Sequence, residues 1–325
     1  MKVLITGGAG FIGSHLAERY LERGDDVYIV DDLSTGTLEN VKHLQEIQSY
    51  RDRLFVTVDT ILNHDIMLEL VGTCDIVVHL AAAVGVQYIL ENPLSSIITN
   101  IQGTEKVLEL CNKFKKKVLI ASTSEVYGKH THAPLVETDN IIYGPPTKFR
   151  WSYAAAKLMD EFTALAYYRT KKLPVIIVRL FNTVGPRQTG RYGMVMPRFV
   201  QQAMRNEPMT VYGDGSQTRT FTYVKDVVEA IVKLMECQDA VGEVVNIGGI
   251  EEVTIMSLAK TVKEFTSSKS EIRLIPYDEV YTKDFEDMQR RVPSIEKLKQ
   301  LIGWQPSTGL EYIIRNFIED YQVTK

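Results

Sequence analysis

The chain has 325 residues, of which 45% are hydrophobic and 24% are charged, and its formal net charge is −4. These are ordinary values for a globular protein with a sizeable core, and the length suggests about two domains. The small negative charge disfavours broad nucleic-acid binding, which depends on an extended basic surface. A few basic residues in a pocket would still suffice to bind an anionic substrate.

The cysteines and the apolar segments predict a protein without a metal site, disulfides or a membrane span. Cys74, Cys111 and Cys237 are far apart and form no C-x-x-C pair. The apolar run at residues 1–5 is too short for a signal peptide, and no later run approaches ~18 apolar residues. We therefore expect a reduced, cytoplasmic location and no membrane partner.

Short apolar strands alternate with amphipathic helical stretches in the first half of the chain. The expected strands are residues 2–5, 27–30, 54–58, 76–80, 118–121 and 175–180, and the clearest helices are 14–23, 103–114 and 154–170. This alternation predicts an α/β fold, a Rossmann doubly wound parallel sheet with helices on both faces.

The pattern changes from about Thr183, where glycine, proline and arginine become frequent. We expect these loops to cover the carboxyl ends of the strands, where ligands bind in open α/β sheets. The prediction is one domain of residues 1–182, to which 222–250 returns, and a smaller domain assembled from 183–221 and 251–325. The C-terminal part of the smaller domain is expected to be mostly helical.

A glycine motif stands between the first expected strand and the first expected helix. Gly7, Gly10 and Gly13 allow a tight turn, a close approach of phosphate to the backbone, and close packing of helix on sheet. The helix N-terminus, where Phe11 and Ile12 lie, supplies amide donors and a partial positive charge for a pyrophosphate. The motif therefore predicts dinucleotide binding.

Acidic residues at the ends of the next strands fit the same site. Asp31 and Asp32 follow the glycines by about twenty residues, where a carboxylate accepts hydrogen bonds from ribose hydroxyls. A carboxylate there also repels a 2′-phosphate, so the expected cofactor is NAD and not NADP. Asp59, at the end of the third strand, is expected to face the adenine. Small residues after the fourth strand would let the cofactor lie close: Leu80, Ala81 and Ala82.

Tyr153 and Lys157 form a Y-x-x-x-K pair, which a helix would place on one face. A nearby ammonium and a positive nicotinamide would lower the phenol's pKa from about 10, so that the phenolate could take a proton from a substrate hydroxyl. Lys157 is also expected to bind the nicotinamide ribose. Thr123, Ser124 and Glu125 follow another strand and should reach the same edge. The alternative for Glu125 is a solvated loop carboxylate.

Several motifs together carry a family resemblance: Thr6-Gly7-Gly8-Ala9-Gly10-Phe11-Ile12-Gly13, His79-Leu80-Ala81-Ala82, Thr123, Tyr153 and Lys157. From Met1 to about Trp304 the chain resembles the extended short-chain dehydrogenase/reductase family, in particular its nucleotide-sugar epimerases, dehydratases and decarboxylases. The resemblance implies tightly held NAD, Tyr153 as acid/base, Lys157 supporting it, and Thr123 completing the triad. It also implies a nucleotide-sugar substrate and a homodimer formed through the Tyr153 helix and residues 103–114.

The resemblance extends to substrate residues in the second half of the chain. It implies that Asn182 contacts the sugar or its diphosphate, and that Arg219, in a V-Y-G-D-G-S-Q-T-R segment, binds phosphate. Arg291 matches a substrate-facing arginine, and Val195 is a further expected substrate contact. The alternative for both arginines is a surface position on rim loops.

The motifs leave open which step follows oxidation at sugar C4, because that oxidation is common to all branches of the family. Thr123-Ser124-Glu125 resembles the T-S-E signature of UDP-glucuronate decarboxylases, although guanosine-diphosphomannose dehydratases also carry it. The segments around Arg150-Trp151 and Arg291-Val292-Pro293 resemble the UDP-glucuronate decarboxylase of the lipid A aminoarabinose pathway, in which an arginine matching Arg291 has a proposed proton-donor role.

The main expectation is therefore decarboxylation of UDP-glucuronate to UDP-xylose or its 4-keto precursor. A 4-epimerase acting on UDP-glucose or UDP-glucuronate is the alternative, and a 4,6-dehydratase is less favoured because Ser124 stands where hexose dehydratases usually carry an aspartate. A non-catalytic nucleotide-sugar sensor belongs to a different class. The intact Thr123, Tyr153 and Lys157 argue against it, because a sensor needs no activated phenol.

Overall fold

The computed structural model describes residues 1–189, 194–280 and 288–323. Three stretches of the predicted second domain, residues 190–193, 281–287 and 324–325, lie outside the described residues.

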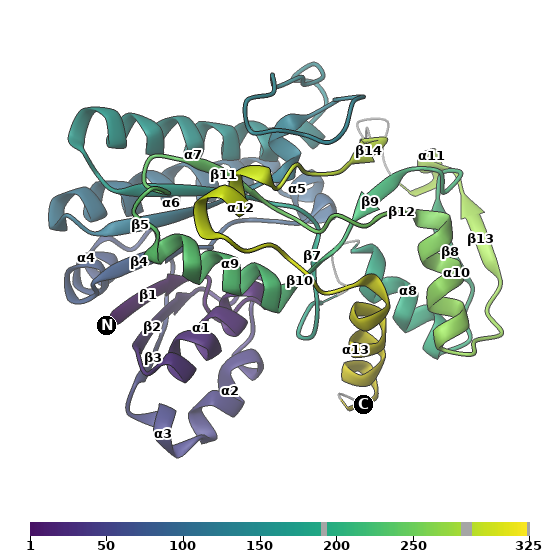
Figure 1. The fold of residues 1–325 in the computed structure, drawn as a ribbon, viewed down its shortest axis with the longest axis horizontal. Coiled ribbons are helices and arrows are strands. Elements are labelled where there is room, and N and C mark those ends of the chain that lie inside the picture. The colour runs from purple at the N-terminus through teal and green to yellow at the C-terminus, as the bar shows by residue number, and fades with distance from the viewer. Residues whose placement is uncertain (190–193, 281–287, 324–325) are drawn as a thin grey trace.

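A seven-stranded parallel sheet lies at the centre of the described structure (Figure 1). Its strands are β1 (Lys2–Thr6), β2 (Asp26–Asp31), β3 (Leu54–Val58), β4 (Ile76–His79), β5 (Lys117–Thr123), β6 (Val175–Leu180) and β11 (Val244–Ile247). Their order is β11-β6-β5-β4-β1-β2-β3, so the chain reverses its direction of travel between β1 and β4. Ligands bind at the carboxyl ends beside such a reversal. The predicted Rossmann fold is confirmed.

Helices cover both faces of this sheet. One face carries α1 (Phe11–Arg23) and α9 (Val224–Glu236), and the other carries α4 (His64–Thr73), α6 (Pro93–Phe114) and α7 (Arg150–Lys171). Successive side chains of a strand point to opposite faces. In β1, Val3 and Ile5 therefore join the core beneath α1 and α9, whereas Leu4 joins the core beneath α4, α6 and α7. A strand that is buried on both sides needs the continuous apolar run that its sequence has.

Among the remaining elements, α2 (Glu39–Glu46), α3 (Gln48–Arg51) and α12 (Glu296–Ile302) pack on the α1 and α9 side of the sheet, and most of the others lie beyond the carboxyl ends of its strands. The other helices are α5 (Val86–Glu91), α8 (Val195–Met204), α10 (Ile255–Phe265), α11 (Tyr277–Val280), α13 (Leu310–Val323) and the short 3₁₀ turn η1 (Ser124–Tyr127). The strands are β7 (Thr183–Val184), β8 (Met209–Tyr212), β9 (Thr218–Thr220), β10 (Thr222–Tyr223), β12 (Glu252–Thr254), β13 (Ile272–Ile275) and β14 (Arg290–Arg291).

A second core forms away from the main sheet, on the right of Figure 1. There α8, α10 and α13 pack together through residues such as Phe199, Leu258 and Ile313, which are fully buried. Beside them lie the parallel pair β8 and β13 and the three-stranded sheet β12-β9-β14. Residues 195–204 lie within the part of the chain that is rich in glycine, proline and arginine, and they are helical because their apolar face completes this core.

Two helices are longer than the sequence suggested, and one extension affects the site. α6 begins at Pro93, ten residues before the expected start, and α7 begins at Arg150, four residues before it. Tyr153 therefore lies in the first turn of α7 rather than ahead of the helix. The early start of α7 also brings Arg150 to the carboxyl edge of the sheet.

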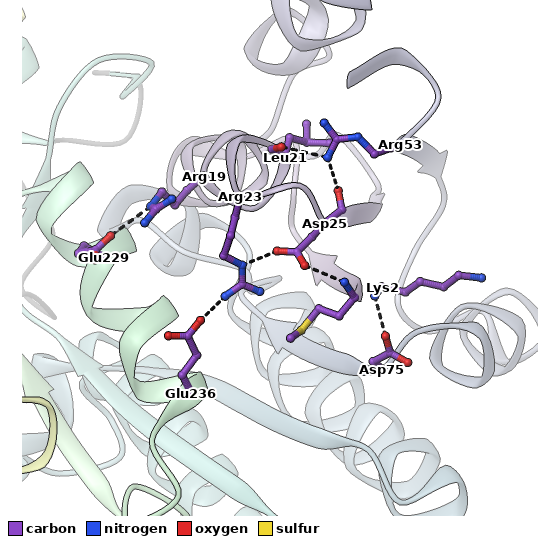
Figure 2. A network of polar contacts seen from close by, with 10 residues as sticks. Lys2, Arg19, Leu21, Arg23, Asp25, Arg53, Asp75, Glu229 and Glu236 are labelled. Atoms are coloured by element: carbon purple, nitrogen blue, oxygen red, sulfur yellow. Dashed lines mark hydrogen bonds and ion pairs between the residues drawn. The ribbon is translucent and has the colours of Figure 1, made fainter. Parts of the chain in front are cut away.

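A polar network fastens α1 to α9 at the edge of the sheet remote from the ligand-binding end (Figure 2). Arg23 donates to Asp25 at 2.5 Å and also pairs with Glu236 of α9. The amino group of Met1 donates to the other Asp25 oxygen at 2.8 Å. Arg19 pairs with Glu229 along the same two helices. This network fixes the start of β1, and hence the position of the glycine loop that follows β1.

Candidate active site

A cavity of about 570 Å³ lies at the carboxyl ends of the strands. The predicted site residues that line it are Gly7, Gly10, Phe11, Ile12, Gly13, Asp31, Asp32, Asp59, Leu80, Ala81, Ala82, Thr123, Ser124, Glu125, Tyr153, Asn182, Val195, Arg219 and Arg291. Lys157 is not in the lining, because it is buried behind the cavity wall with only 2% of its surface exposed. The fold thus gathers segments that are nearly 300 residues apart in the sequence into one pocket.

The glycine loop is shaped so closely that side chains would not fit. At Gly7, where φ is +71°, a Cβ would lie 2.8 Å from the backbone nitrogen of Ala81. At Gly13 a Cβ would lie 2.2 Å from the carbonyl oxygen of Gly7. Gly10 caps α1 without a side-chain hydrogen bond, so the first turn of the helix faces the cavity without a competing side chain. A pyrophosphate fits this cradle.

Carboxylates stand at the ends of β2 and β3 beside the cradle. Asp31 accepts hydrogen bonds from the backbone amides of Ala9 at 3.0 Å and Leu33 at 2.9 Å, and so holds the glycine loop to β2. Burial raises the pKa of Asp31, while these amide hydrogen bonds oppose the rise. Asp59 accepts from the amide of Thr60 at 2.7 Å. The carboxylates fit the ribose and adenine end of a dinucleotide.

Tyr153 also lines the cavity and is hydrogen-bonded to the side chain of Thr123. Burial raises the pKa of the Tyr153 phenol, and the carboxylates of Glu125 and Asp160 raise it further. The expected lowering of this pKa is therefore wrong for the protein's own charges. The physical reason is that the phenol is buried beside two carboxylates, and that the Lys157 ammonium is itself paired with Asp160, at 2.8 Å, where both side chains are 2% exposed.

Glu125 is clamped between two arginines from distant segments. Arg150 donates to one of its oxygens, and Nη1 of Arg291 lies 3.3 Å from the other. Although burial opposes it, the field of these guanidiniums lowers the pKa of Glu125 to about 2. The carboxylate is thus ionised and only 13% exposed, so the alternative of a solvated loop carboxylate is wrong.

Arg219 and Arg291 stand side by side in the wall of the cavity. They are partners in the parallel pairing of β9 with β14, and they are only 6% and 9% exposed. The alternative of surface arginines on rim loops is therefore wrong for both. Arg291 also donates to Ser124 Oγ at 3.4 Å. With Arg150, the wall holds three guanidiniums against the single Glu125 carboxylate, so it favours an anion.

The two remaining predicted substrate residues, Asn182 and Val195, also line the cavity. Asn182 follows β6 and donates its side-chain amide to the carbonyl oxygen of Thr220 at 2.8 Å, which fixes β6 to the strand β9. Val195 is the first residue of α8 and faces the cavity.

Sequence reasoning missed an aromatic and polar end of the cavity. The Arg198 guanidinium lies 3.8 Å from the centre of the Tyr212 ring, and Gln217 donates to the hydroxyl of Tyr277 at 3.1 Å. All four residues line the cavity. Tyr212 and Gln217 belong to the same V-Y-G-D-G-S-Q-T-R segment as Arg219, so this segment could have indicated both of them. Arg198 and Tyr277 are brought there only by α8 and α11.

The described residues offer neither a metal site nor a membrane-crossing helix. They contain no cluster of three or more His, Cys, Asp or Glu side chains that could hold a metal ion. Within residues 1–189, 194–280 and 288–323, no helix is both long enough and apolar enough to cross a bilayer.

A family model described as GDP-mannose 4,6 dehydratase matches residues 4–317. The chain belongs to this family of nucleotide-sugar enzymes, within the extended short-chain dehydrogenase/reductases. Among related proteins, a UDP-N-acetyl-alpha-D-glucosaminuronate decarboxylase of Bacillus cytotoxicus is 42% identical over 98% of this chain and 97% of its own. UDP-glucuronic acid decarboxylase 4 of Arabidopsis thaliana is 37% identical over 99% of this chain and 69% of its own.

Solved structures of the family share the whole fold. A UDP-glucuronic acid 4-epimerase of Bacillus cereus, in complex with UDP-glucuronic acid and NAD, superposes with a TM-score of 0.89 at 29% identity and covers 100% of both chains. A dTDP-glucose 4,6-dehydratase of Bacillus anthracis, in complex with NAD, has a TM-score of 0.86 at 27% identity over 100% of this chain and 97% of its own. The family fold thus hosts decarboxylases, epimerases and dehydratases.

Proposed function

We propose that this protein is an NAD-dependent decarboxylase of a UDP-hexuronate, with UDP-glucuronate as the main candidate substrate. Two related proteins, 42% and 37% identical to this chain, are named decarboxylases of UDP-N-acetyl-alpha-D-glucosaminuronate and of UDP-glucuronic acid. The observation that carries the proposal is the Glu125 carboxylate held ionised between Arg150 and Arg291 beside Tyr153.

The proposed cofactor residues are the glycine loop and the neighbouring groups that line the cavity. The glycine loop with Phe11 and Ile12 would hold the pyrophosphate, and Asp31, Asp32 and Asp59 the adenosine half. Leu80, Ala81 and Ala82 form a further part of the cavity wall. When bound there, NAD supplies the oxidising equivalent for C4 of the sugar. We assign residues 1–182 with 222–250 to this NAD-binding domain, and 183–221 with 251–325 to the nucleotide-sugar-binding domain.

The catalytic roles follow from position. Tyr153, hydrogen-bonded to Thr123, takes the proton of the sugar's C4 hydroxyl. Lys157, pinned behind the wall, supports the phenol and the nicotinamide ribose. The pKa of the Tyr153 phenol is raised by the protein and must fall for this transfer. We propose that the positive nicotinamide lowers this pKa, which Lys157 alone does not do.

The three arginines in the cavity wall, Arg150, Arg219 and Arg291, suit the decarboxylation that follows oxidation at C4. Arg291, beside Arg219 and across from Glu125, would hold the uronate carboxylate while the bond from C5 to that carboxyl breaks and CO2 leaves. The electron pair passes to the 4-ketone as an enolate, and a proton from water then adds to C5 in place of the carboxyl. Glu125 does not donate this proton, because its pKa of about 2 keeps it ionised. Its role is to orient Arg150 and Arg291. Overall, one proton replaces one CO2.

Product analysis tests the proposal directly. Purified protein is incubated in parallel with UDP-glucuronate, UDP-N-acetylglucosaminuronate and UDP-glucose, and the products are read by NMR with trapping of evolved CO2. A UDP-pentose or its 4-keto form, with CO2, is expected from UDP-glucuronate. Faster turnover of the acetamido sugar would transfer the assignment to that substrate, as in the Bacillus cytotoxicus relative.

A 4-epimerase is the second candidate, because the superposed Bacillus cereus enzyme is one and binds UDP-glucuronic acid. A galacto-configured product that retains six carbons, from UDP-glucuronate or UDP-glucose, would establish it. A Tyr153→Phe variant separates both enzymes from a sensor. An enzyme loses about 10²–10⁴-fold in turnover when its general acid/base is removed, whereas a sensor shows no turnover in either form and unchanged ligand binding.

We also propose a homodimer formed through α6 and α7. Large apolar side chains are exposed along these helices: Leu94 (71%), Ile98 (37%), Met159 (50%) and Phe162 (62%). A second copy would cover them. Sedimentation of Phe162→Glu beside the native protein tests this, since the variant is expected to be a monomer. A cytoplasmic location is proposed with it, because Cys74, Cys111 and Cys237 are all free thiols.

A further inference from the structure

The buried carboxylate of Asp160 holds the Lys157 ammonium in place. Asp160 lies one turn after Lys157 on α7 and accepts from its ammonium at 2.8 Å. Asp160 also accepts a hydrogen bond from the side chain of Thr104, which lies on α6 and is 1% exposed. None of the roles assigned above uses Asp160, although burying a carboxylate so fully is costly unless it is paired and hydrogen-bonded.

The hydrogen bonds continue from Thr104 to the cofactor cradle. Thr104 Oγ1 lies 3.1 Å from Nε2 of His79, and Nδ1 of His79 lies 2.7 Å from Oγ1 of Thr6. The amide of Ala81 donates to the same Thr6 oxygen at 3.1 Å. Thr6 directly precedes the glycine loop, and Ala81 is one of the small residues that follow β4. The chain of contacts therefore connects the proposed cofactor site to Lys157.

The donors of this chain can be arranged in only one direction when Asp160 is ionised. Thr104 gives its single hydroxyl hydrogen to Asp160, so it must accept from Nε2–H of His79. Burial lowers the pKa of His79 to about 3, with the Lys157 ammonium lowering it further, so the ring is neutral and its Nδ1 carries no hydrogen. Nδ1 then accepts from Thr6, which in turn accepts from Ala81.

We propose that Asp160 is a positioning residue that aims the Lys157 ammonium, and that the relay of Thr104, His79 and Thr6 fixes Asp160 relative to the cofactor cradle. One ammonium hydrogen is committed to Asp160, so the other two are directed by the geometry of α7 and not by free rotation. The proposal rests on the role assigned above to Lys157. It predicts a tautomer for His79, which can be observed without any turnover.

Nitrogen NMR of isotope-labelled histidine in the NAD-containing protein tests the relay, with the His79 signal assigned by a His79→Gln variant. The native ring is expected to carry its hydrogen on Nε2. In Asp160→Asn, the amide oxygen faces Lys157 and the NH2 group faces Thr104. Thr104 then accepts from this NH2 group, which frees its hydroxyl hydrogen to be donated to Nε2. The His79 hydrogen is therefore expected to move to Nδ1.

The matched control is Glu161→Gln, the next residue of α7, whose carboxylate accepts hydrogen bonds from Arg179 and Ser122 instead of from Lys157 and Thr104. It is expected to leave the hydrogen on Nε2. A native His79 with its hydrogen on Nδ1 would overturn the proposal, as would an Asp160→Asn protein whose His79 is unchanged. If Asp160→Asn does not fold, the native tautomer decides alone.

A second readout follows the consequence for Tyr153. Its phenol is faced by Glu125 of η1, by Arg150 and Asp160 of α7, and through Glu125 by Arg291 of β14. Removing the Asp160 charge leaves the Lys157 ammonium uncompensated, so phenolate absorbance, measured against Tyr153→Phe counterparts, should appear at lower pH than in the native protein. An unchanged titration would overturn the proposal. Absence of decarboxylation with the expected tautomers would count against the proposed function alone.

Discussion

Arg219 and Arg291 stand as direct partners across two parallel strands, so two buried guanidiniums share one wall of the cavity. Like charges this close are tolerated only where anions balance them. Glu125 supplies one negative charge. The surplus of positive charge is the feature that suits a substrate with both a diphosphate and a carboxylate.

Arg291→Met is expected to lower kcat/KM for UDP-glucuronate by at least about 30-fold, because losing one member of a buried, hydrogen-bonded charge pair costs about 2–5 kcal/mol. Steady-state kinetics measure it. The matched control is Arg290→Met: Arg290 is the preceding residue, is exposed, and pairs with Glu252 away from Glu125. Equal losses in the two variants would contradict a specific role for Arg291.

Glu125→Gln should reduce turnover without removing a limb from the pH profile. The arginines hold the pKa of Glu125 at about 2, so this group is already ionised throughout the range in which the enzyme can be assayed. The profiles of kcat/KM for native and variant protein should therefore have the same shape and differ in height. An acidic limb present in the native profile and lost in the variant would show that Glu125 titrates during catalysis.

Gly13→Ala is expected to abolish retention of NAD, because its Cβ would lie 2.2 Å from the Gly7 carbonyl oxygen and would force the glycine loop open. Gly24→Ala is the control. Gly24 ends the same helix at φ +95°, but a Cβ there meets nothing within 4 Å. That change should cost about 1 kcal/mol of stability through backbone strain alone. The nucleotide released on denaturing each purified protein gives the comparison, and equal NAD content in both variants would refute it.

The network at Asp25 should make stability depend on acid pH. Burial opposes the effect, but hydrogen bonds from Arg23 and the terminal amine lower the pKa of Asp25 below its unfolded value. A lowered carboxyl pKa stabilises the fold above the unfolded pKa of about 3.9, and this contribution disappears as pH falls through the folded pKa. Asp25→Asn should therefore destabilise by about 1–2 kcal/mol at neutral pH.

Urea denaturation at pH 7 and again at about pH 3 measures this dependence on Asp25. The difference between native protein and Asp25→Asn should shrink at the lower pH. Glu229→Gln, which breaks the more exposed pair with Arg19, is the control and should have a smaller effect at pH 7. A difference that persists undiminished in acid would mean that packing, and not the charge, is responsible.

The local motifs were readable from the sequence because each depends on neighbours in the chain. The glycine loop, the acids after β2 and the Tyr153–Lys157 spacing all express the geometry of one strand, one turn or one helix. The parallel sheet was readable for a similar reason, since strands buried on both faces, such as Lys2–Thr6 with its run Val3-Leu4-Ile5, carry continuous apolar sequence. The family resemblance added roles to these residues.

The charges at the site were decided only by the tertiary structure. Glu125, Arg150 and Arg291 meet because η1, the early start of α7 and β14 converge, and no spacing in the sequence encodes that distance. The sign of the shift in the pKa of Tyr153 was mispredicted because burial of the phenol and its approach to Glu125 and Asp160 are also properties of the folded chain. Asp160 was visible at i+3 from Lys157, but its effect depends on burial, and burial is a property of the packed fold. Electrostatic energies rise steeply as water is excluded, so a sequence names the charged groups and only the folded chain sets their strength.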